Sequence, residues 1–208
     1  MNRSWRQISH VAILFIAGAF LTGCVTDQHA RIGVVLGDKI KAGNVTNGDL
    51  APDFSFVSED EKVDTFSQIR GDVTLVTFPD DPNWPNCQRC YKLAQLISRL
   101  TRAQTSITAI SIANPIKSCD EAFRMLRACE IKAQIKFIIL CDQHGRICDL
   151  YGSHARGKFF VIDNDGRIIA LGKFKDTASV EEALRSAVYE HEVHCNRLYG
   201  PQEIDWFY

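Results

Sequence analysis

The sequence lacks an excess of charge of either sign, which limits the partners it can bind. Its 208 residues include 24 lysines and arginines and 25 aspartates and glutamates, for a formal net charge of −1. Domains that bind nucleic acid usually carry a basic patch or stripe, so this balance argues against a nucleic-acid partner. The sequence also has no proline- and glycine-rich segment and no block of like charge, so its composition is that of a globular protein.

Long hydrophobic runs are equally scarce. A single segment near the N-terminus is apolar enough to meet a bilayer, which excludes a protein with several transmembrane helices. The sequence contains no G-x-S-x-G, no glycine-rich phosphate loop and no H-E-x-x-H motif, so it gives no support to the hydrolase, nucleotide-binding and zinc-protease classes that use them. We find no internal repeat.

The first 24 residues have the pattern of an export signal. Two arginines precede an apolar run at residues 11–20, which is too short for a comfortable transmembrane helix. The segment ends in Leu-Thr-Gly-Cys at Cys24, which resembles a bacterial lipobox whose cysteine is acylated. We expect residues 1–23 to be a signal peptide and lipid on Cys24 to anchor the protein at a membrane. An ordinary signal peptide with a chance cysteine is the alternative.

The lipobox resemblance implies the bacterial cell envelope. Val25 follows the cysteine, and by resemblance to enterobacterial sorting this favours the outer membrane, facing the periplasm, with the cell exterior as the alternative. Residues 24–48 are polar and glycine-rich, and we expect a tether with one short strand near residues 32–36. Residues 49–208 would then form the folded domain.

From residue 73 onward, short β-rich runs alternate with helical patterns. We expect strands at 73–78, 107–112, 137–140, 158–162 and 167–171, and helices at 90–103, 118–130 and 179–198. Strands separated by helices favour parallel pairing, and the Asp165-Gly166 step predicts a hairpin that adds antiparallel strands. The pattern therefore predicts an α/β protein with a mixed central sheet and helices on both faces.

The most specific chemical signal is the pair of cysteines in Cys87-x-x-Cys90. The pair follows an expected buried strand and opens an expected amphipathic helix. A helix N-terminus stabilises a thiolate, and Arg89 adds a positive charge beside it. This context favours a redox-active dithiol. A static disulfide and half of a zinc site are the alternatives.

Two further motifs carry a family resemblance, namely Ala-Pro-Asp-Phe at residues 51–54 and F-V-I-D-x-D-G at residues 160–166. With the cysteine motif, they make residues 49–187 similar to the peroxiredoxin and AhpC/TSA (redoxin) branch of the thioredoxin superfamily. The resemblance implies a thioredoxin-like three-layer sandwich in which the first motif leads a β-hairpin. It also implies thiol chemistry on a peroxide or a disulfide, with an external thiol reductant and no required cofactor.

The sequence departs from this family's pattern in three places. Trp84 occupies the position three residues before Cys87, where peroxiredoxins keep Thr or Ser. No proline lies between residues 115 and 201, and the position of the thioredoxin cis-proline matches Gly157 or Lys158. Arg156 lies one position from the arginine that holds the peroxiredoxin thiolate. Reduction of peroxide and exchange with protein disulfides therefore both stay open.

The resemblance assigns roles to two more residues. Arg156 would lower the pKa of Cys87 through its positive charge, and an arginine exposed on a loop is the alternative. Cys119 opens the expected helix at 118–130, where one peroxiredoxin class places its resolving cysteine, so it competes with Cys90 for that role.

His154 allows a second interpretation, in which this site binds copper. Copper chaperones of the cytochrome-oxidase assembly type share this fold and bind copper through two cysteines and a histidine before the same strand. Thiolate and imidazole ligands suit copper, so Cys87, Cys90 and His154 are a candidate copper site. A non-catalytic redoxin-fold scaffold is a further alternative.

The remaining cysteines predict local structure. We expect Cys141 and Cys148 to form a disulfide across a tight turn, which an oxidising compartment allows, and Cys129 to be a buried, inert thiol. A metal cluster near the last helix is a weaker interpretation, and its members would be His144, His191, His194 and Cys195. On balance the sequence predicts a lipid-anchored, extracytoplasmic thiol oxidoreductase with Cys87 as the attacking thiolate.

Overall fold

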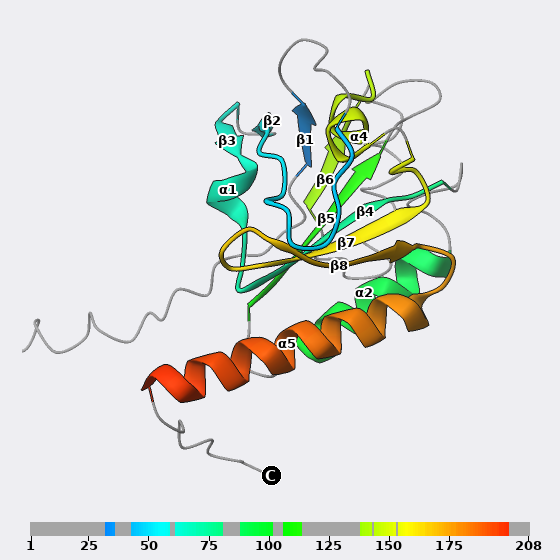
Figure 1. Cartoon of the computed structure of the whole chain (residues 1–208). Coiled ribbons are helices and arrows are strands. Elements are labelled where there is room, and N and C mark those ends of the chain that lie inside the picture. Colours follow the sequence, from blue (N-terminus) through cyan, green and yellow to red (C-terminus); the bar gives the residue numbers. More distant parts are fainter. Residues whose placement is uncertain are drawn as a thin grey trace, which may run out of the picture.

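A mixed sheet forms the centre of the molecule, and in the described part of the chain it has eight strands, in the order β3-β2-β1-β6-β5-β4-β7-β8 (Figure 1). The computed structural model describes residues 32–35, 43–58, 61–80, 88–101, 106–113, 138–142, 144–152 and 154–199. The strands are β1 (Ile32–Val35), β2 (Ser55–Ser58), β3 (Val63–Thr65), β4 (Val73–Phe78), β5 (Ile107–Ala113), β6 (Ile138–Cys141), β7 (Lys158–Asp163) and β8 (Ile168–Lys173).

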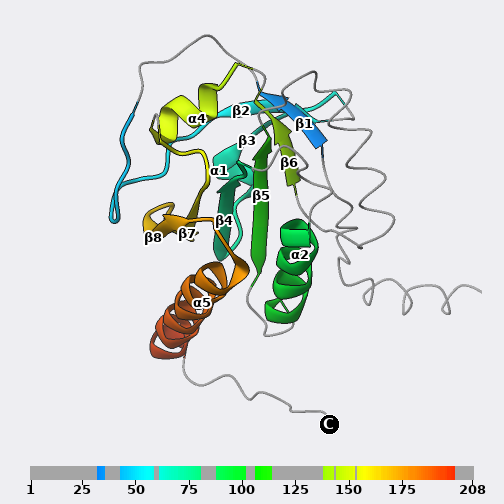
Figure 2. The same cartoon turned by 90° about the vertical axis from the view of Figure 1, so that its right-hand side faces the viewer.

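Helices cover both faces of this sheet (Figure 2). On one face, α2 (Gln88–Leu100) and α5 (Thr177–Tyr199) lie side by side. The short helices α1 (Phe66–Ile69) and α4 (Arg146–Tyr151) pack their buried side chains into the core on the other face. This arrangement confirms the expected three-layer α/β sandwich. In the described part of the chain, no helix combines the length and the apolar character that crossing a membrane requires.

Strand pairing in the sheet is mixed, as the alternating pattern predicted. β4, β5, β6 and β1 pair with one another in parallel, whereas the other neighbours are antiparallel. The hairpin expected at Asp165-Gly166 joins β7 to β8. The helix expected at residues 118–130 lies outside the described residues.

β4 is an inner strand of the sheet, paired with β5 and β7, and it separates two hydrophobic clusters. All six of its residues are buried. Val73 and Leu75 point into the cluster beneath α2 and α5, whereas Val76 and Phe78 point into the cluster on the opposite face. Burial on both faces explains why the strand's sequence is a nearly continuous apolar run, and this run made the strand predictable.

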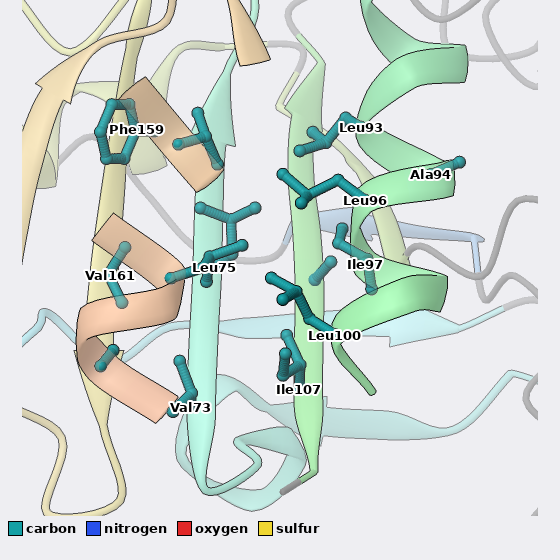
Figure 3. Close-up of a cluster of buried hydrophobic side chains, with 14 of the residues drawn as sticks. Val73, Leu75, Leu93, Ala94, Leu96, Ile97, Leu100, Ile107, Phe159 and Val161 are labelled. Carbon is teal, nitrogen blue, oxygen red and sulfur yellow. The ribbon is translucent and has the colours of Figure 1, made fainter. Parts of the chain in front are cut away.

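One stripe of apolar side chains packs α2 against the sheet and so determines its position. Leu93, Leu96, Ile97 and Leu100 are all buried, and Figure 3 shows them pointing from the helix toward the sheet. Their spacing of three or four residues places them on one side of an α-helix. Packing of this stripe fixes the helix against β5 and thereby sets where its first turn lies, just beyond the end of β4.

The sheet also includes residues upstream of position 49. β1 forms where a short strand was expected within the tether, and it lies between β2 and β6. β2 and β3 form the antiparallel hairpin that the family resemblance implied. Stacking of the Phe54 and Phe66 rings, with centroids 5.0 Å apart, packs the segment before β2 against α1.

One expectation, a disulfide between Cys141 and Cys148, is wrong. Cys148 is a free thiol, whereas Cys141 is disulfide-bonded, so no Cys141–Cys148 bond forms. The segment between these cysteines is not a bare tight turn, because helix α4 starts at Arg146. The Asp142 carboxylate accepts hydrogen bonds from the backbone N–H groups of Arg146, Ile147 and Cys148 at 2.7 to 3.1 Å. This capping by a buried side chain explains why the helix forms here.

Candidate functional site

A helix begins where the sequence predicted one, and the second cysteine of the motif, Cys90, lies in its first turn. Gln88, Arg89 and Cys90 form the first turn of this helix, which follows the end of β4 at Phe78 along the chain. Cys87 and the side chain of Cys90 lie outside the described residues. A helix N-terminus stabilises a nearby thiolate, and α2 begins at Gln88, directly after Cys87 in the sequence.

Arg89, between the two cysteines, is fixed by three contacts. Its guanidinium donates a hydrogen bond to the Phe174 carbonyl oxygen at 2.8 Å and lies 3.4 Å from a carboxylate oxygen of Asp80. It also lies over the Phe174 ring, 5.8 Å from the centroid. Because 29% of its side chain is exposed, its charge is only partly screened by solvent. Arg89 thus holds a positive charge at the first turn of α2.

The loop before β7 crosses the end of β4 at Gly157. The Gly157 N–H donates to the Phe78 carbonyl oxygen at 2.7 Å, and the Gly157 carbonyl accepts from the Phe174 N–H at 2.7 Å. With the Arg89–Phe174 bond, these contacts connect the start of α2, the end of β4 and the loops flanking β7 and β8. The loop therefore lies at the same edge of the sheet as the start of α2.

Gly157 explains why this loop has no proline. Its φ of +71° is left-handed, a conformation that proline, with φ fixed near −65°, cannot adopt. Its N–H is also used in the bond to Phe78, and proline has no N–H to donate. The backbone at position 157 therefore excludes proline there, for both conformational and hydrogen-bonding reasons.

Arg156 is exposed in this loop, next to Gly157. Its backbone N–H bonds to the Cys148 thiol, and its positive charge acts on the same thiol. Burial is the larger influence and raises the pKa of Cys148, whereas the Arg156 charge opposes that rise. The role expected for Arg156 at Cys87 stays a prediction because Cys87 lies outside the described residues.

Three aromatic rings pack against one another near the end of β4, to which this loop is bonded. Tyr151 on α4 contacts Phe78 and Phe160, with ring centroids 5.2 and 4.9 Å apart. Its side chain is buried, and burial raises the pKa of its phenol far above the ordinary value. Within the described structure its hydroxyl has no hydrogen-bond partner. This tyrosine therefore serves as a packing residue under the end of β4.

His154, the candidate copper ligand, is exposed in the same loop. Because Cys87 and the Cys90 side chain are outside the described residues, the proposed copper set stays a prediction. Cys119 and Cys129 also lie outside them. Among the described residues no group of three or more His, Cys, Asp and Glu is arranged to hold a metal ion. The metal cluster considered for His144, His191, His194 and Cys195 therefore does not form; of these four side chains, the structure pairs His191 with Cys195.

Sequence reasoning missed two residues of the site. Asp80 follows β4, and its carboxylate pairs with Arg89. Phe174 follows β8, bonds to Arg89 and Gly157 through its backbone, and is buried. Neither residue stands in a recognisable motif. The apolar Phe174 between Lys173 and Lys175 was the one available signal of an inward-facing position.

Comparison with known proteins identifies a family that this chain matches. A model of the AhpC/TSA family matches residues 47–171, which is more than half of the chain. The match contains β2 to β7, the cysteine motif and the loop at Gly157. Among curated proteins, no significant match was found.

Solved structures match most of the chain at low identity. The peroxidoxin BcpB from Mycobacterium tuberculosis has a TM-score of 0.52 and 16% identity, covering 69% of this chain and 96% of its own. The yeast mitochondrial 1-Cys peroxiredoxin has a TM-score of 0.53 and 14% identity, covering 78% and 83%. A Bacteroides thetaiotaomicron protein described as a protein disulfide isomerase has a TM-score of 0.53 and 22% identity, covering 74% and 98%. These likenesses establish a thioredoxin-like fold.

Proposed function

The chain belongs to the AhpC/TSA family, and from that premise we propose that Cys87 and Cys90 form the redox dithiol of a membrane-anchored, extracytoplasmic enzyme. The chain is a thiol oxidoreductase of the redoxin type. One observation supports the assignment to these cysteines: Gln88, Arg89 and Cys90 begin α2 at the edge of the sheet where Gly157 bonds to the end of β4 and Phe174 bonds to Arg89. A dithiol here has a helix N-terminus and a fixed guanidinium beside it.

The chemistry proceeds in two steps. With a disulfide substrate, the Cys87 thiolate attacks one sulfur, the substrate S–S bond breaks, and a substrate thiolate leaves. With a peroxide, the thiolate attacks one oxygen, the O–O bond breaks, Cys87 becomes a sulfenic acid, and the other oxygen leaves and takes up a proton to give water or an alcohol. Cys90 then attacks the Cys87 sulfur, which releases the second substrate thiol or water and leaves a Cys87–Cys90 disulfide. An external dithiol returns both cysteines to the reduced state.

Two residues tune the attacking sulfur in this proposal. Arg89 supplies a positive charge at the first turn of α2, which favours the thiolate over the thiol. Arg156 supplies a second charge from the loop beside Gly157. Cys119 is the alternative resolving cysteine, which would replace Cys90 in the second step.

The test uses the full-length protein and two substrates, hydrogen peroxide and a protein disulfide, each with a thiol reductant. Cys87→Ser should abolish turnover of the preferred substrate, and Cys90→Ser should trap Cys87 as a sulfenate or a mixed disulfide. Cys148→Ser is the matched control, because this thiol is buried and its pKa is raised, so its loss should leave turnover intact. Full activity of the Cys87→Ser protein would overturn the proposal. If Cys119→Ser, and not Cys90→Ser, traps the intermediate, the resolving role belongs to Cys119.

Membrane attachment is a separate part of the proposal. The lipobox-like segment supports acylation of Cys24, which would anchor the domain in the cell envelope. The outer membrane is favoured, with the domain facing the periplasm, and the cell exterior is the alternative. Metabolic labelling with a radioactive fatty acid should label the protein, and Cys24→Ala should remove the label. Labelling that persists in the variant would exclude Cys24 as the anchor.

Copper transfer is the second candidate function. It is favoured by the place of His154, which is exposed in the loop that Gly157 ties to the end of β4. Cu(I) titration of the reduced protein should show one tightly bound ion that His154→Ala releases. The exposed His144→Ala is the matched control. Binding that is absent, or equal in both variants, would exclude His154 as a ligand.

A further inference from the structure

A free thiol and a histidine lie together at the far end of the molecule from the cysteine motif. Cys195 and His191 are one turn apart on α5, and the thiol sulfur lies 3.4 Å from the histidine Nε2. The same nitrogen lies 3.7 Å from a carboxylate oxygen of Asp72. Asp72 precedes β4, whereas the cysteine motif follows it, so the length of this strand, roughly 20 Å, separates the two places.

Asp72 is held firmly in this position. Its Oδ2 accepts hydrogen bonds from the backbone N–H and the hydroxyl of Ser106, both at 2.8 Å. The Ser106 hydroxyl oxygen in turn accepts from the Asp72 N–H at 3.0 Å. These bonds orient the carboxylate so that its other oxygen, Oδ1, faces His191. The geometry therefore combines a thiol, an imidazole and a fixed negative charge.

The surroundings of Cys195 differ from those of Cys148, the second free thiol in the described structure. Cys148 is buried, and burial raises its pKa. Cys195 is half-buried, and the side chains of His191 and Asp72 are 18% and 39% exposed. Cys195 is therefore more accessible to a small molecule than Cys148, and its partial burial disfavours the approach of a disulfide held in a folded protein. This contrast selects Cys195 as the reactive member of the pair.

We propose that Cys195 is a second thiol site, which exchanges with low-molecular-weight disulfides and uses His191 as its base. His191 Nε2 takes the thiol proton, and the Cys195 sulfur attacks one sulfur of the small disulfide. The S–S bond of that molecule breaks, one half leaves as a thiolate that takes up the proton, and the other half stays on Cys195 as a mixed disulfide. Cys195 is oxidised and the leaving half is reduced, so no further reactant is needed.

Asp72 is a positioning residue in this site. The sulfur and the carboxylate approach the same nitrogen, so the negative charge of Asp72 stabilises the imidazolium that forms when Nε2 takes the thiol proton. The site is independent of the proposed dithiol, since none of its residues contacts the loop at Gly157 or the start of α2 in the described structure. It would let the redox state of small thiols modify the protein away from its main reaction.

The test measures modification of individual cysteines in the full-length, reduced protein. The probe is 4,4′-dithiodipyridine at pH 7, and samples quenched over time are digested and analysed by peptide mass spectrometry. The variant is His191→Gln, and the matched control is His194→Gln, which makes the same chemical change at an exposed histidine of the same helix. Cys148 serves as an internal reference in every sample, because any loosening of the fold would raise its rate as well.

We expect Cys195 to react at least about tenfold faster than Cys148, and His191→Gln to lower the Cys195 rate by about fivefold or more, as expected when an adjacent base is lost. His194→Gln should leave the rate within about twofold. The product should be a mixed disulfide on Cys195. The proposal is overturned if Cys195 reacts no faster than Cys148, or if the two histidine variants change the ratio of the two rates equally.

Discussion

The backbone N–H of Gly157 donates a hydrogen bond to the carbonyl oxygen of Phe78 across 2.7 Å. This contact ties the loop before β7 to the last residue of β4, which leads toward the cysteine motif. It depends on a residue that has both an N–H group and freedom to adopt a left-handed φ. The edge of the sheet that carries the proposed dithiol is therefore organised around a glycine.

Two substitutions of Gly157 should lower the stability of the fold by different amounts. Gly157→Ala keeps the N–H but places a side chain at a φ of +71°, which costs about 1–2 kcal/mol. Gly157→Pro also removes the hydrogen bond to Phe78 and should cost about 1 kcal/mol more, in addition to the backbone rearrangement. Urea unfolding of both variants checks the order. Equal stability of the two variants would show that the bond to Phe78 contributes nothing.

Gly48→Ala is the control for the effect on chemistry. Gly48 has a φ of +90° with open space around its Cβ position, so alanine there carries a similar backbone cost away from the site. We expect the reaction rate of Cys87 to fall in Gly157→Ala and to stay unchanged in Gly48→Ala. An equal fall in both variants would mean that lost stability, and not loop position, controls the rate.

Arg89→Gln should slow the reaction of Cys87 with a disulfide by about three- to tenfold at neutral pH, since removal of a nearby positive charge raises a thiol pKa. The variant also loses the contacts to Phe174 and Asp80 that fix the first turn of α2. Stopped-flow measurement of the wild-type and variant rates over a range of pH checks the prediction. A rate profile that does not shift toward higher pH would contradict a role for this charge.

Arg99→Gln supplies the matched control on the same helix. Arg99 lies near the other end of α2 and pairs with Glu181 of α5 at 2.9 Å. The same substitution there removes an equal charge and an exposed ion pair, which contributes little to stability. The rate of Cys87 should not change in this variant.

Tyr151→Phe should stabilise the protein by about 1 kcal/mol, because it removes a buried hydroxyl that has no partner in the described structure. The ring contacts with Phe78 and Phe160 stay in place. Tyr189→Phe is the control, since this side chain is 68% exposed and its hydroxyl loses no solvation. Thermal and urea unfolding measure both variants. A loss of stability in Tyr151→Phe would show that the hydroxyl has a bonding role.

Asp142→Asn tests the burial of the carboxylate that caps α4. Burial raises the pKa of Asp142, and three backbone N–H groups only partly oppose that rise. A carboxyl whose pKa is higher in the folded chain binds its proton more tightly there, so folding gains free energy as the pH falls. The stability of the wild type relative to the variant should therefore increase as the pH is lowered from neutral toward 3.8, the ordinary pKa. If the stability of the wild type relative to the variant instead decreases as the pH is lowered, the hydrogen bonds to the carboxylate outweigh its burial.

The elements that sequence predicted well are those with a strong local pattern. β4 has apolar side chains on both faces, and α2 has one apolar stripe, so both were predicted to within a few residues. Helix α4 was missed because its start depends on the buried Asp142 carboxylate, and the cysteines at positions 141 and 148 suggested a disulfide in its place.

The arrangement of the site could be predicted only in part. The order of strand and helix predicted a helix that starts at the motif, and Cys90 lies in the first turn of α2. The contacts of Gly157 with Phe78 and Phe174 join residues far apart in sequence, so no local pattern could have predicted them. Arg89 was expected to supply charge, but its anchoring by Phe174 and Asp80 depends on tertiary structure.

Disulfide mapping after a single oxidation tests the central claim most directly. The full-length protein is fully reduced without oxygen, treated with one equivalent of hydrogen peroxide or of a protein disulfide, quenched with acid, and mapped by non-reducing peptide mass spectrometry. The account predicts that a disulfide containing Cys87, with Cys90 as its partner, forms before any other cysteine is modified. Oxidation of other cysteines while Cys87 stays reduced would contradict it.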